Sequence, residues 1–253
     1  MNNKTAVVLI DFDNLFKKDL SSYNENDFFV VFKNIVNEIV FDIPNINKIN
    51  IRLYGGWFKE NTLSSKASIL VNILAQINLF PYIQINPLRR IYGSIEIATS
   101  LYGINYIWHN TLREKNGLPR LKVNTNLLTS ICEENKNVCP AKILNKFTKS
   151  KNRICSVPGC TTKNKNVFIS IEQKMVDTML SCDLISFCNE IDIKYILLFS
   201  DDTDFFPPLA LGSHIISESD KKITLAIKNA LLLDNYKEIL EPFNVEIIPH
   251  NYE

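Results

Sequence analysis

Apolar residues in this chain fall into short continuous runs that alternate with stretches of helical periodicity. Ala6–Ile10 and Tyr195–Phe199 are runs of five residues rich in β-forming side chains. Runs of this length are typical of strands that are buried on both faces of a sheet. Asn26–Phe41 instead repeats its apolar residues every three or four positions, as one face of a helix does. The alternation of the two patterns predicts an α/β fold with a doubly wound, mainly parallel sheet.

The same reading extends along the whole chain. We expect strands at Thr5–Asp11, Lys48–Gly55, Phe80–Ile85, Asn166–Ile171, Lys194–Phe199, Lys222–Ile227 and Val245–Ile248. We expect helices at Asn26–Phe41, Ser64–Ile77, Glu172–Cys188, Pro207–Ser213 and Asn235–Leu240.

Two regions do not follow this alternation. Ile91–Trp108 fits a strand or a helix equally, and Leu121–Val123 fits a short strand. Residues 124–166 are rich in Asn, Lys and Cys and show little periodicity. We therefore predict one domain over residues 1–253, with 124–166 as an inserted basic module that contains cysteines.

Charge is distributed unevenly although the net charge is only +1. Residues 110–166 contain 12 Lys and Arg and 3 Glu, a charge of 12 − 3 = +9, which leaves 16 − 24 = −8 for the remainder. A basic module on an acidic body suggests a polyanionic partner, and a solvated lysine-rich loop is the alternative. The candidate nucleic-acid contacts are Lys142, Lys146, Lys149, Lys151, Arg153, Lys163 and Lys165.

The apolar pattern also bears on location. The run that follows Met1–Lys4 is too short for a signal peptide, and no stretch reaches the roughly 18–20 apolar residues of a membrane span. We expect a cytoplasmic protein without a membrane partner. Its six cysteines are then expected to be reduced, metal-bound or buried rather than paired in disulfides. The oligomeric state is left open, a homodimer included.

Acidic residues follow two of the predicted strands. Asp11, Asp13 and Asn14 come after the first strand, and Asp202 and Asp204 come after the strand at Lys194–Phe199. Ligands of open α/β sheets bind beyond the carboxyl ends of the strands, so the two groups should meet at one edge. Carboxylates packed together repel each other, and Mg²⁺ or Mn²⁺ relieves that repulsion with oxygen ligands. The pattern predicts a metal site at this edge.

Three motifs, in order and spacing, resemble the NYN family, a branch of the PIN-like nucleases that includes the LabA group. The motifs are Asp-x-x-Asn at Asp11 and Asn14, Lys-x-x-Asp at Lys174 and Asp177, and Ser-x-Asp-x-Asp-Phe from Ser200 to Phe205. Met175 and Asp201 stand where the family has Gly. The resemblance covers residues 5–60 and 166–248 and does not explain 87–165.

The resemblance implies an endoribonuclease that hydrolyses phosphodiester bonds in RNA with Mg²⁺ or Mn²⁺. The implied metal ligands are Asp11, Asp177, Asp202 and Asp204, with Asn14 as a further catalytic residue. Supporting positions around them are Asp13, Lys174, Asp183, Ser200 and Asp201.

Alternative functions stay open at this point. A DNA nuclease would use the same carboxylates, because they do not distinguish ribose from deoxyribose. A catalytically silent RNA-binding or regulatory protein would keep the fold and lose the metal chemistry. A HAD-like phosphatase also has Asp-x-Asp after its first strand, but Leu15 stands where its Thr is expected, which argues against it.

Four cysteines of the inserted module form two sequence pairs. Cys132 and Cys139 are separated by six residues, and Cys155 and Cys160 flank a Pro-Gly turn. Two thiolate pairs suit a tetrahedral structural Zn²⁺ site, although six residues exceed the usual spacing within a pair. Four free thiols are the alternative. The other two cysteines, Cys182 and Cys188, lie in an apolar helical pattern and are expected in the core.

Overall fold

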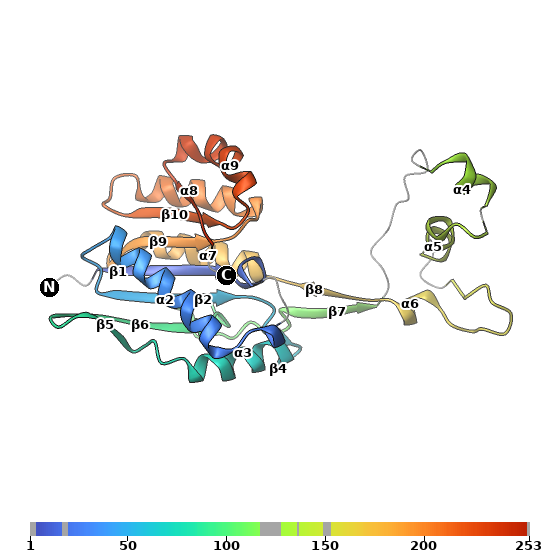
Figure 1. Cartoon of the computed structure of the whole chain (residues 1–253), viewed down its shortest axis with the longest axis horizontal. Helices are drawn as coiled ribbons and strands as arrows, with labels where there is room; N and C mark the ends of the chain where they lie inside the picture. The colour runs from blue at the N-terminus through green and yellow to red at the C-terminus, as the bar shows by residue number, and fades with distance from the viewer. Residues whose placement is uncertain (1–3, 17–19, 117–127, 136, 149–152, 252–253) are drawn as a thin grey trace. The chain divides into compact units, whose positions relative to one another are not determined.

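A computed structural model describes residues 4–16, 20–116, 128–135, 137–148 and 153–251. The chain divides into two compact units (Figure 1). Residues 1–111 and 173–253 form the first, called here the sheet unit, and Leu112–Glu172 forms the second, called the inserted unit. The sequence analysis predicted one domain over residues 1–253 with an insertion at 124–166. The second unit starts earlier than that insertion, at Leu112, and ends later, at Glu172.

A seven-stranded sheet organises the sheet unit, in the order β11-β10-β9-β1-β2-β6-β5. All neighbouring pairs are parallel except β5 and β6, which form an antiparallel edge. The strands are β1 (Thr5–Asp11), β2 (Lys48–Tyr54), β5 (Tyr82–Asn86), β6 (Arg89–Ile97), β9 (Ile193–Phe199), β10 (Lys222–Ile227) and β11 (Glu246–Pro249). A short hairpin, β3 (Phe58–Lys59) and β4 (Thr62–Leu63), follows β2.

The order in which the chain adds strands to the sheet changes direction at β1. From β1 the chain continues to β2 on one side, and it returns later to β9 on the other side. In register, Asp11 lies opposite Tyr54 of β2, and its neighbour Ile10 lies opposite Phe199 of β9. The carboxyl ends of β1 and β9 therefore lie at a topological switch point, where open α/β sheets bind their ligands.

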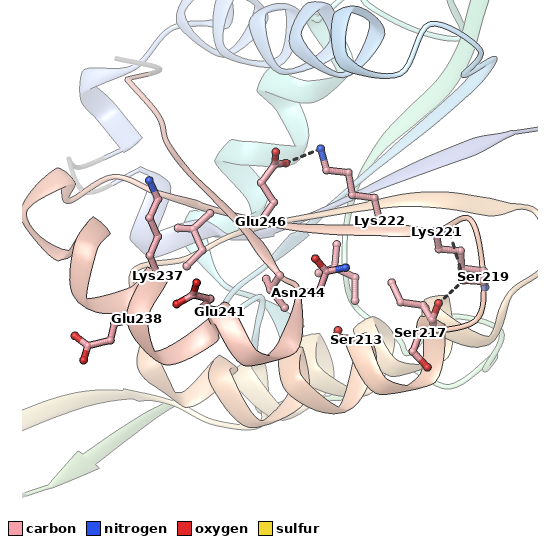
Figure 2. Close-up of a pocket in the computed structure, with 14 residues that line it drawn as sticks. Ser213, Ser217, Ser219, Lys221, Lys222, Lys237, Glu238, Glu241, Asn244 and Glu246 are labelled. Atoms are coloured by element: carbon pink, nitrogen blue, oxygen red, sulfur yellow. Dashed lines mark hydrogen bonds and ion pairs between the residues drawn. The ribbon is translucent and has the colours of Figure 1, made fainter.

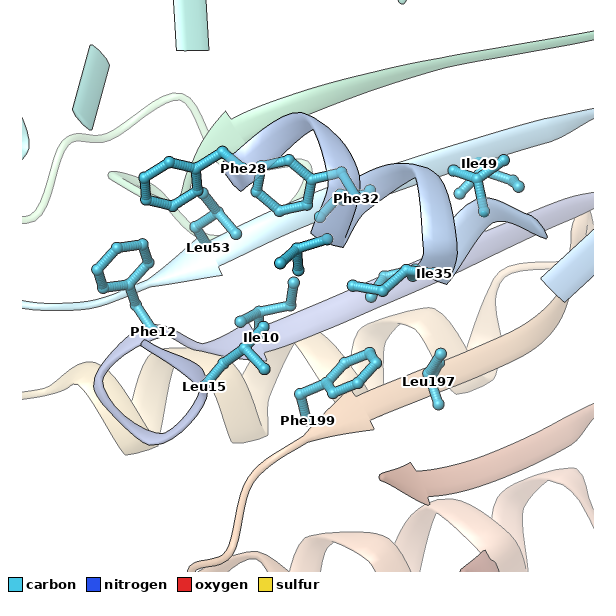
Figure 3. Packing of buried hydrophobic residues seen from close by; sticks show 14 of the residues in the cluster. Ile10, Phe12, Leu15, Phe28, Phe32, Ile35, Ile49, Leu53, Leu197 and Phe199 are labelled. Atoms are coloured by element: carbon cyan, nitrogen blue, oxygen red, sulfur yellow. The ribbon is translucent and has the colours of Figure 1, made fainter. Parts of the chain in front are cut away.

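Apolar side chains cover both faces of this sheet. Even-numbered residues of β1, such as Val8 and Ile10, pack in one buried cluster with α2 and α3. Val7 and Leu9 point the other way and pack with α7, α8 and α9. Figure 3 shows Phe28 and Phe32 of α2 against the strands in the first cluster. Because both faces are buried, the strands read as continuous apolar runs.

Capping residues in the sequence set where the main helices begin. Asn24 caps α2 by accepting hydrogen bonds from the amides of Asn26 (2.8 Å) and Asp27 (3.1 Å). Ser64 caps α3 by accepting one from Ala67 (3.1 Å). The α-helices of the sheet unit are α1 (Phe12–Leu15), α2 (Glu25–Asp42), α3 (Ser65–Gln76), α7 (Val176–Asn189), α8 (Phe206–Ile216) and α9 (Leu233–Leu240). Single 3₁₀ turns are η1 (Leu20–Ser22), η3 (Thr203–Phe205), η4 (Ala230–Leu232) and η5 (Glu241–Phe243).

The inserted unit consists of short elements with little burial. They are β7 (Leu112–Asn116), α4 (Ser130–Glu134), α5 (Pro140–Thr148), α6 (Asn164–Val167) and β8 (Ile169–Gln173), the last of which ends in the sheet unit. Strands β7 and β8 are neighbours. Among its described residues, only Cys139 and Asn164 are buried.

The α/β class and the mainly parallel sheet are confirmed. The β5–β6 edge pair is antiparallel within that sheet, and Ile91–Ile97 of the ambiguous region belong to β6. Four local predictions need correction. The strand predicted at Asn166–Ile171 begins only at Ile169, after helix α6 (Asn164–Val167). The helix predicted from Glu172 begins at Val176, because Met175 before it is left-handed (φ 65°). Within 124–166, where we expected little regular structure, α5 forms nine residues of helix. Cys182, expected in the core, is exposed on α7, whereas Cys188 is buried.

Two points concern the limits of the described chain. The short strand expected at Leu121–Val123 lies outside the described residues. Among the helices that the structure does describe, none has the length and apolar character needed to cross a membrane.

Candidate metal centre

Asp11 is the most buried of the four predicted metal ligands. It ends β1 and is 7% exposed. Its Oδ2 accepts hydrogen bonds from Ser200 Oγ (3.1 Å) and from the side-chain amide of Asn14. Ser200 follows β9 and Asn14 lies in the helical turn after β1, so the two segments predicted to meet at this edge do meet. Through its hydrogen bond, Asn14 fixes the orientation of the Asp11 carboxylate.

The loop after β9 orders the second group of carboxylates. Ser200 Oγ accepts a hydrogen bond from the amide of Asp202 (3.1 Å). Asp202 in turn caps η3, because its Oδ1 accepts from the amide of Asp204 (2.9 Å). Asp202, and not the neighbouring Ser200, therefore caps this turn. Asp204 is exposed.

The start of α7 supplies the third segment. Asp177 lies in the first turn of this helix. Helix α7 packs on the face of the sheet that contains Leu9, and Asp11 lies on the same face because side chains alternate along a strand. Lys174 is half-buried, and its amide donates to the carbonyl of Thr111 (2.9 Å). Met175 has a left-handed backbone (φ 65°), a conformation that favours Gly. By contrast, Asp201 is not among the described residues with positive φ.

The carboxylates of these segments influence one another's ionisation. Burial raises the pKa of Asp11, the hydrogen bonds from Asn14 and Ser200 lower it, and the charges of Asp177 and Asp202 raise it further. Burial also raises the pKa of Asp177, followed by the charges of Asp202 and Asp204. The four predicted ligands therefore lie within one electrostatic neighbourhood. Within the described ranges, however, no three Asp, Glu, His or Cys side chains are grouped closely enough to hold a metal ion.

Asp13 has two partners that the sequence analysis missed. Its carboxylate contacts Lys66 Nζ of α3 and the side-chain amide of Gln173. Lys66 Nζ also lies 4.8 Å from the ring centroid of Phe12, and burial lowers the pKa of Lys66 to about 8 against the opposing charge of Asp11. A signal was available, since the first turn of a helix that follows a parallel strand lies near the carboxyl edge of the sheet.

Asp183 and Asp201 are placed elsewhere than the carboxylate group. Asp183 is fully buried, where it accepts hydrogen bonds from Tyr54 Oη (2.6 Å) and the Tyr102 amide (2.8 Å) and lies 3.3 Å from Arg52. Asp201 accepts from the amides that follow β10, Lys228 at 2.7 Å and Asn229 at 3.2 Å. These contacts give Asp183 a role in the core and Asp201 a role in holding two loops together.

The four cysteines of the inserted unit are free thiols, of which Cys139 is buried and Cys132, Cys155 and Cys160 are half-buried. Among the described residues they do not form a group that could hold a metal ion. Hydrogen bonds from the Lys142 amide and from Cys132 lower the pKa of Cys139, and those from Thr162 and Cys155 lower the pKa of Cys160. Of the predicted basic contacts, Lys149 and Lys151 lie outside the described residues, and the others belong to the inserted unit.

A large pocket of the sheet unit lies away from these carboxylates. It measures about 1060 Å³ and is lined by α8, α9, β10 and β11 (Figure 2). Its polar groups largely pair with each other or with backbone, as in the Lys222–Glu246 ion pair (2.8 Å) and the bond from Lys221 to the Glu190 carbonyl (2.7 Å). None of the predicted site residues lines it.

The assembled site therefore consists of acidic side chains from β1, α7 and the β9 loop, with Asn14 and Ser200 bound to Asp11. Comparisons of this chain with protein-family models, with curated proteins and with solved structures find no match.

Proposed function

We propose that this protein is a metal-dependent nuclease of the NYN type that hydrolyses phosphodiester bonds in RNA. The observation that carries the proposal is the position of Asp11. It is buried at the switch point of the sheet, and the charges of Asp177 and Asp202 raise its pKa. Carboxylates brought together in this way are typical of sites that bind divalent cations or transfer protons.

The chemistry of the side chains fits Mg²⁺ or Mn²⁺. Asp11, Asp177, Asp202 and Asp204 offer only oxygen atoms, which these hard cations prefer. When bound, the cation supplies an activated water and neutralises charge on the phosphate. Ser200 and Asn14 orient Asp11, since both donate to its Oδ2. Lys66, paired with Asp13, adds a cation at the same edge, and we propose that it contacts substrate phosphate.

The family resemblance gains support from the backbone of α7. Met175 stands where the NYN pattern has Gly, and its φ of 65° is the conformation that Gly adopts without strain. The chain therefore keeps the turn although it lacks the glycine. That turn sets the start of α7, and with it the position of Asp177.

A catalytically silent RNA-binding protein is the second candidate. It is favoured by the absence, among the described residues, of three acidic, His or Cys side chains grouped as a metal site. Such a protein would bind RNA in a salt-dependent manner without turnover.

Cleavage of end-labelled single-stranded RNA and DNA of matched sequence distinguishes these candidates. Each substrate is incubated with Mn²⁺, Mg²⁺ or EDTA, using the wild type and the Asp11→Asn/Asp202→Asn variant. We expect RNA cleavage that requires the metal and that falls at least about 100-fold in the variant. Asp220→Asn is the matched control, because Asp220 is an exposed carboxylate that pairs with Lys194.

Each alternative has its own result. Cleavage of DNA alone would keep the site and change the substrate. RNA binding without cleavage of either strand would favour the silent protein. Equal activity in the wild type and the double variant would remove the proposed site.

A further inference from the structure

A loop without acidic residues, Lys or Arg lies at the same edge of the sheet as the carboxylates. It comprises residues 98–111, which follow β6 and form neither helix nor strand. A loop of this length without regular structure is uncommon in a compact unit and is usually functional. Because β6 is parallel to β2 and β2 to β1, the loop leaves the sheet at the edge where Asp11 lies. The carboxyl ends of β1 and β6 are two strand spacings apart, which is about 10 Å.

Hydrogen bonds and packing hold the end of this loop beside α7. The amide of Trp108 donates to the carbonyl of Thr99 (2.8 Å) within the loop. The carbonyl of Thr111 accepts from the amide of Lys174 (2.9 Å), just before α7 begins. The indole of Trp108 packs against the apolar cluster that contains α7. The end of the loop therefore lies next to the start of the helix that carries Asp177.

Two aromatic rings of the loop, Tyr106 and Trp108, are called here the aromatic platform. The side chain of Tyr106 is 58% exposed, and its ring centroid lies 5.1 Å from that of Trp108 in an edge-to-face arrangement. Ile104 and Ile107 beside it are also exposed. The indole nitrogen of Trp108 is covered and has no hydrogen-bond partner among the described residues. A Phe would fill this space without an unpaired donor, so packing alone does not explain Trp at this position.

The chemistry of this surface fits an unpaired nucleobase. The loop offers neither Lys nor Arg to a phosphate, whereas the flat, uncharged face of a base matches an exposed aromatic ring. Bases of single strands stack on such rings with little dependence on sequence. Bases of a double helix are already stacked and paired, so they are not available to the ring. A separation of about 10 Å corresponds to about three stacked nucleotides, at about 3.4 Å each.

We propose that the aromatic platform stacks an unpaired base of single-stranded RNA while a phosphate a few nucleotides away lies at the carboxylates. This inference rests on the proposed function and adds its substrate class, single-stranded rather than double-stranded RNA. Tyr106 contacts the base and determines this specificity. Trp108 is a positioning residue, because its indole supports the Tyr106 ring.

Equilibrium binding in EDTA tests the platform without any need for cleavage. A labelled oligouridylate and a labelled RNA duplex of the same length are titrated with the full-length protein. We expect Tyr106→Ala to weaken binding of the single strand by about 10-fold, as loss of one stacked base does, and to change duplex binding by less than about twofold. Tyr106→Phe keeps the ring and should bind the single strand as tightly as the wild type.

Tyr92→Ala is the matched control. Tyr92 is 52% exposed and lies in the same strand that leads to the loop. It pairs in register with Lys48, the first residue of β2, so it lies toward the opposite edge of the sheet. This substitution removes an equally exposed tyrosine far from the carboxylates, and it should leave binding of both RNAs unchanged.

Two further readouts separate stacking from charge. Because Tyr106→Ala removes no charge, the slope of log K against log salt concentration should stay the same although the affinity falls. The only other tryptophan, Trp57, is 1% exposed. Quenching of tryptophan fluorescence by the single strand should therefore come from Trp108, and it should be lost in Tyr106→Ala.

The outcomes distinguish the platform from the nuclease. If the wild type and Tyr106→Ala bind the single strand equally, the platform is overturned even when the protein cleaves RNA. An equal loss of single-strand and duplex binding also overturns it, because stacking requires an unpaired base. If binding falls as expected but the wild type cleaves no RNA with Mn²⁺ or Mg²⁺, the platform stands and the nuclease function is removed.

Discussion

The two units of this chain reach order by different means. The sheet unit buries an apolar cluster on each face of its sheet, whereas the inserted unit buries only Cys139 and Asn164 among its described residues. The sheet unit also contains unfavourable features: a buried carboxylate at Asp11, another at Asp183 and a left-handed Met175. Such features persist only where surrounding packing determines the local structure. A well-packed unit can therefore contain a strained or charged site. The described part of the inserted unit has too little apolar burial to offset such a site.

Matched leucine truncations give the largest expected contrast between the units. Leu198 in β9 is fully buried, and Leu144 in α5 is 41% exposed. We expect Leu198→Ala to lower the free energy of unfolding by about 3–5 kcal/mol, because it leaves a cavity in the sheet core. Leu144→Ala should change the main urea transition by less than about 0.5 kcal/mol. Equal losses would mean that the inserted unit has a core coupled to the sheet.

Asp183 tests how much the core depends on its buried charges. Its carboxylate accepts from Tyr54 and Tyr102 and lies beside Arg52, whose side chain is 8% exposed. Asp183→Asn should cost about 3 kcal/mol in urea unfolding, because it leaves the guanidinium without its buried partner. Asp220→Asn, the same substitution at an exposed ion pair, should leave the midpoint unchanged. If Asp183→Asn leaves the unfolding midpoint unchanged, the ion pair with Glu96 is sufficient to stabilise the Arg52 guanidinium.

Asp11 should show the opposite sign, because burial and the charges of Asp177 and Asp202 raise its pKa, whereas Asp183 has the buried Arg52 beside it. Asp11→Asn removes a buried carboxylate whose pKa is raised, and one amide oxygen can still accept from Asn14 and Ser200, which both use Oδ2. We expect a gain of about 1 kcal/mol in unfolding free energy in EDTA at neutral pH. Loss of stability would contradict the unfavourable charge.

The same residue gives a pH dependence with a definite sign. Because the folded protein holds a proton on Asp11 more tightly than the unfolded chain does, this site adds stability at low pH, and that stability is lost as the pH rises through the raised pKa. The difference between the wild type and Asp11→Asn should therefore shrink as the pH is lowered. If the difference in unfolding free energy between the two proteins is the same at every pH, the pKa of Asp11 is not raised.

The sequence predicts the sheet unit well because its elements are buried on both faces. Six of the seven predicted strands fall in the sheet unit, and β1, β9 and β10 begin and end within a residue of the expected positions. The order of motifs placed Asp11, Ser200 and Asp202 together correctly. Lys66 was missed although it lies in the first turn of α3, near the carboxyl edge of the sheet, because the sequence motifs considered do not include its contact with Asp13.

The errors have local physical causes. The helix predicted from Glu172 begins four residues later, because apolar periodicity cannot reveal a left-handed residue at Met175. Helical periodicity alone also gave a wrong prediction for Cys182. This residue was expected in the core, but it is exposed, whereas the next residue, Asp183, is buried. In the inserted unit, Ile143, Leu144 and Phe147 lie at helical spacing in α5, and the prediction missed this short apolar pattern among the surrounding Asn, Lys and Cys residues.

Met175 provides the smallest expected effect and the most direct test of the tension between strain and packing. A left-handed backbone costs a non-Gly residue about 1–2 kcal/mol, and the half-buried Met side chain returns about 1 kcal/mol by packing against the α7 cluster. Met175→Gly should therefore raise the free energy of unfolding by about 0.5 kcal/mol. Thr178→Gly, inside the same helix, is the control and should lower it by about 0.5 kcal/mol, because Gly is a poorer helix former than Thr. If Met175→Gly is destabilising, packing by Met175 outweighs its strain, and the chain keeps Met here for the core of the sheet unit. If it is stabilising, the position needs only the backbone turn that Gly also provides.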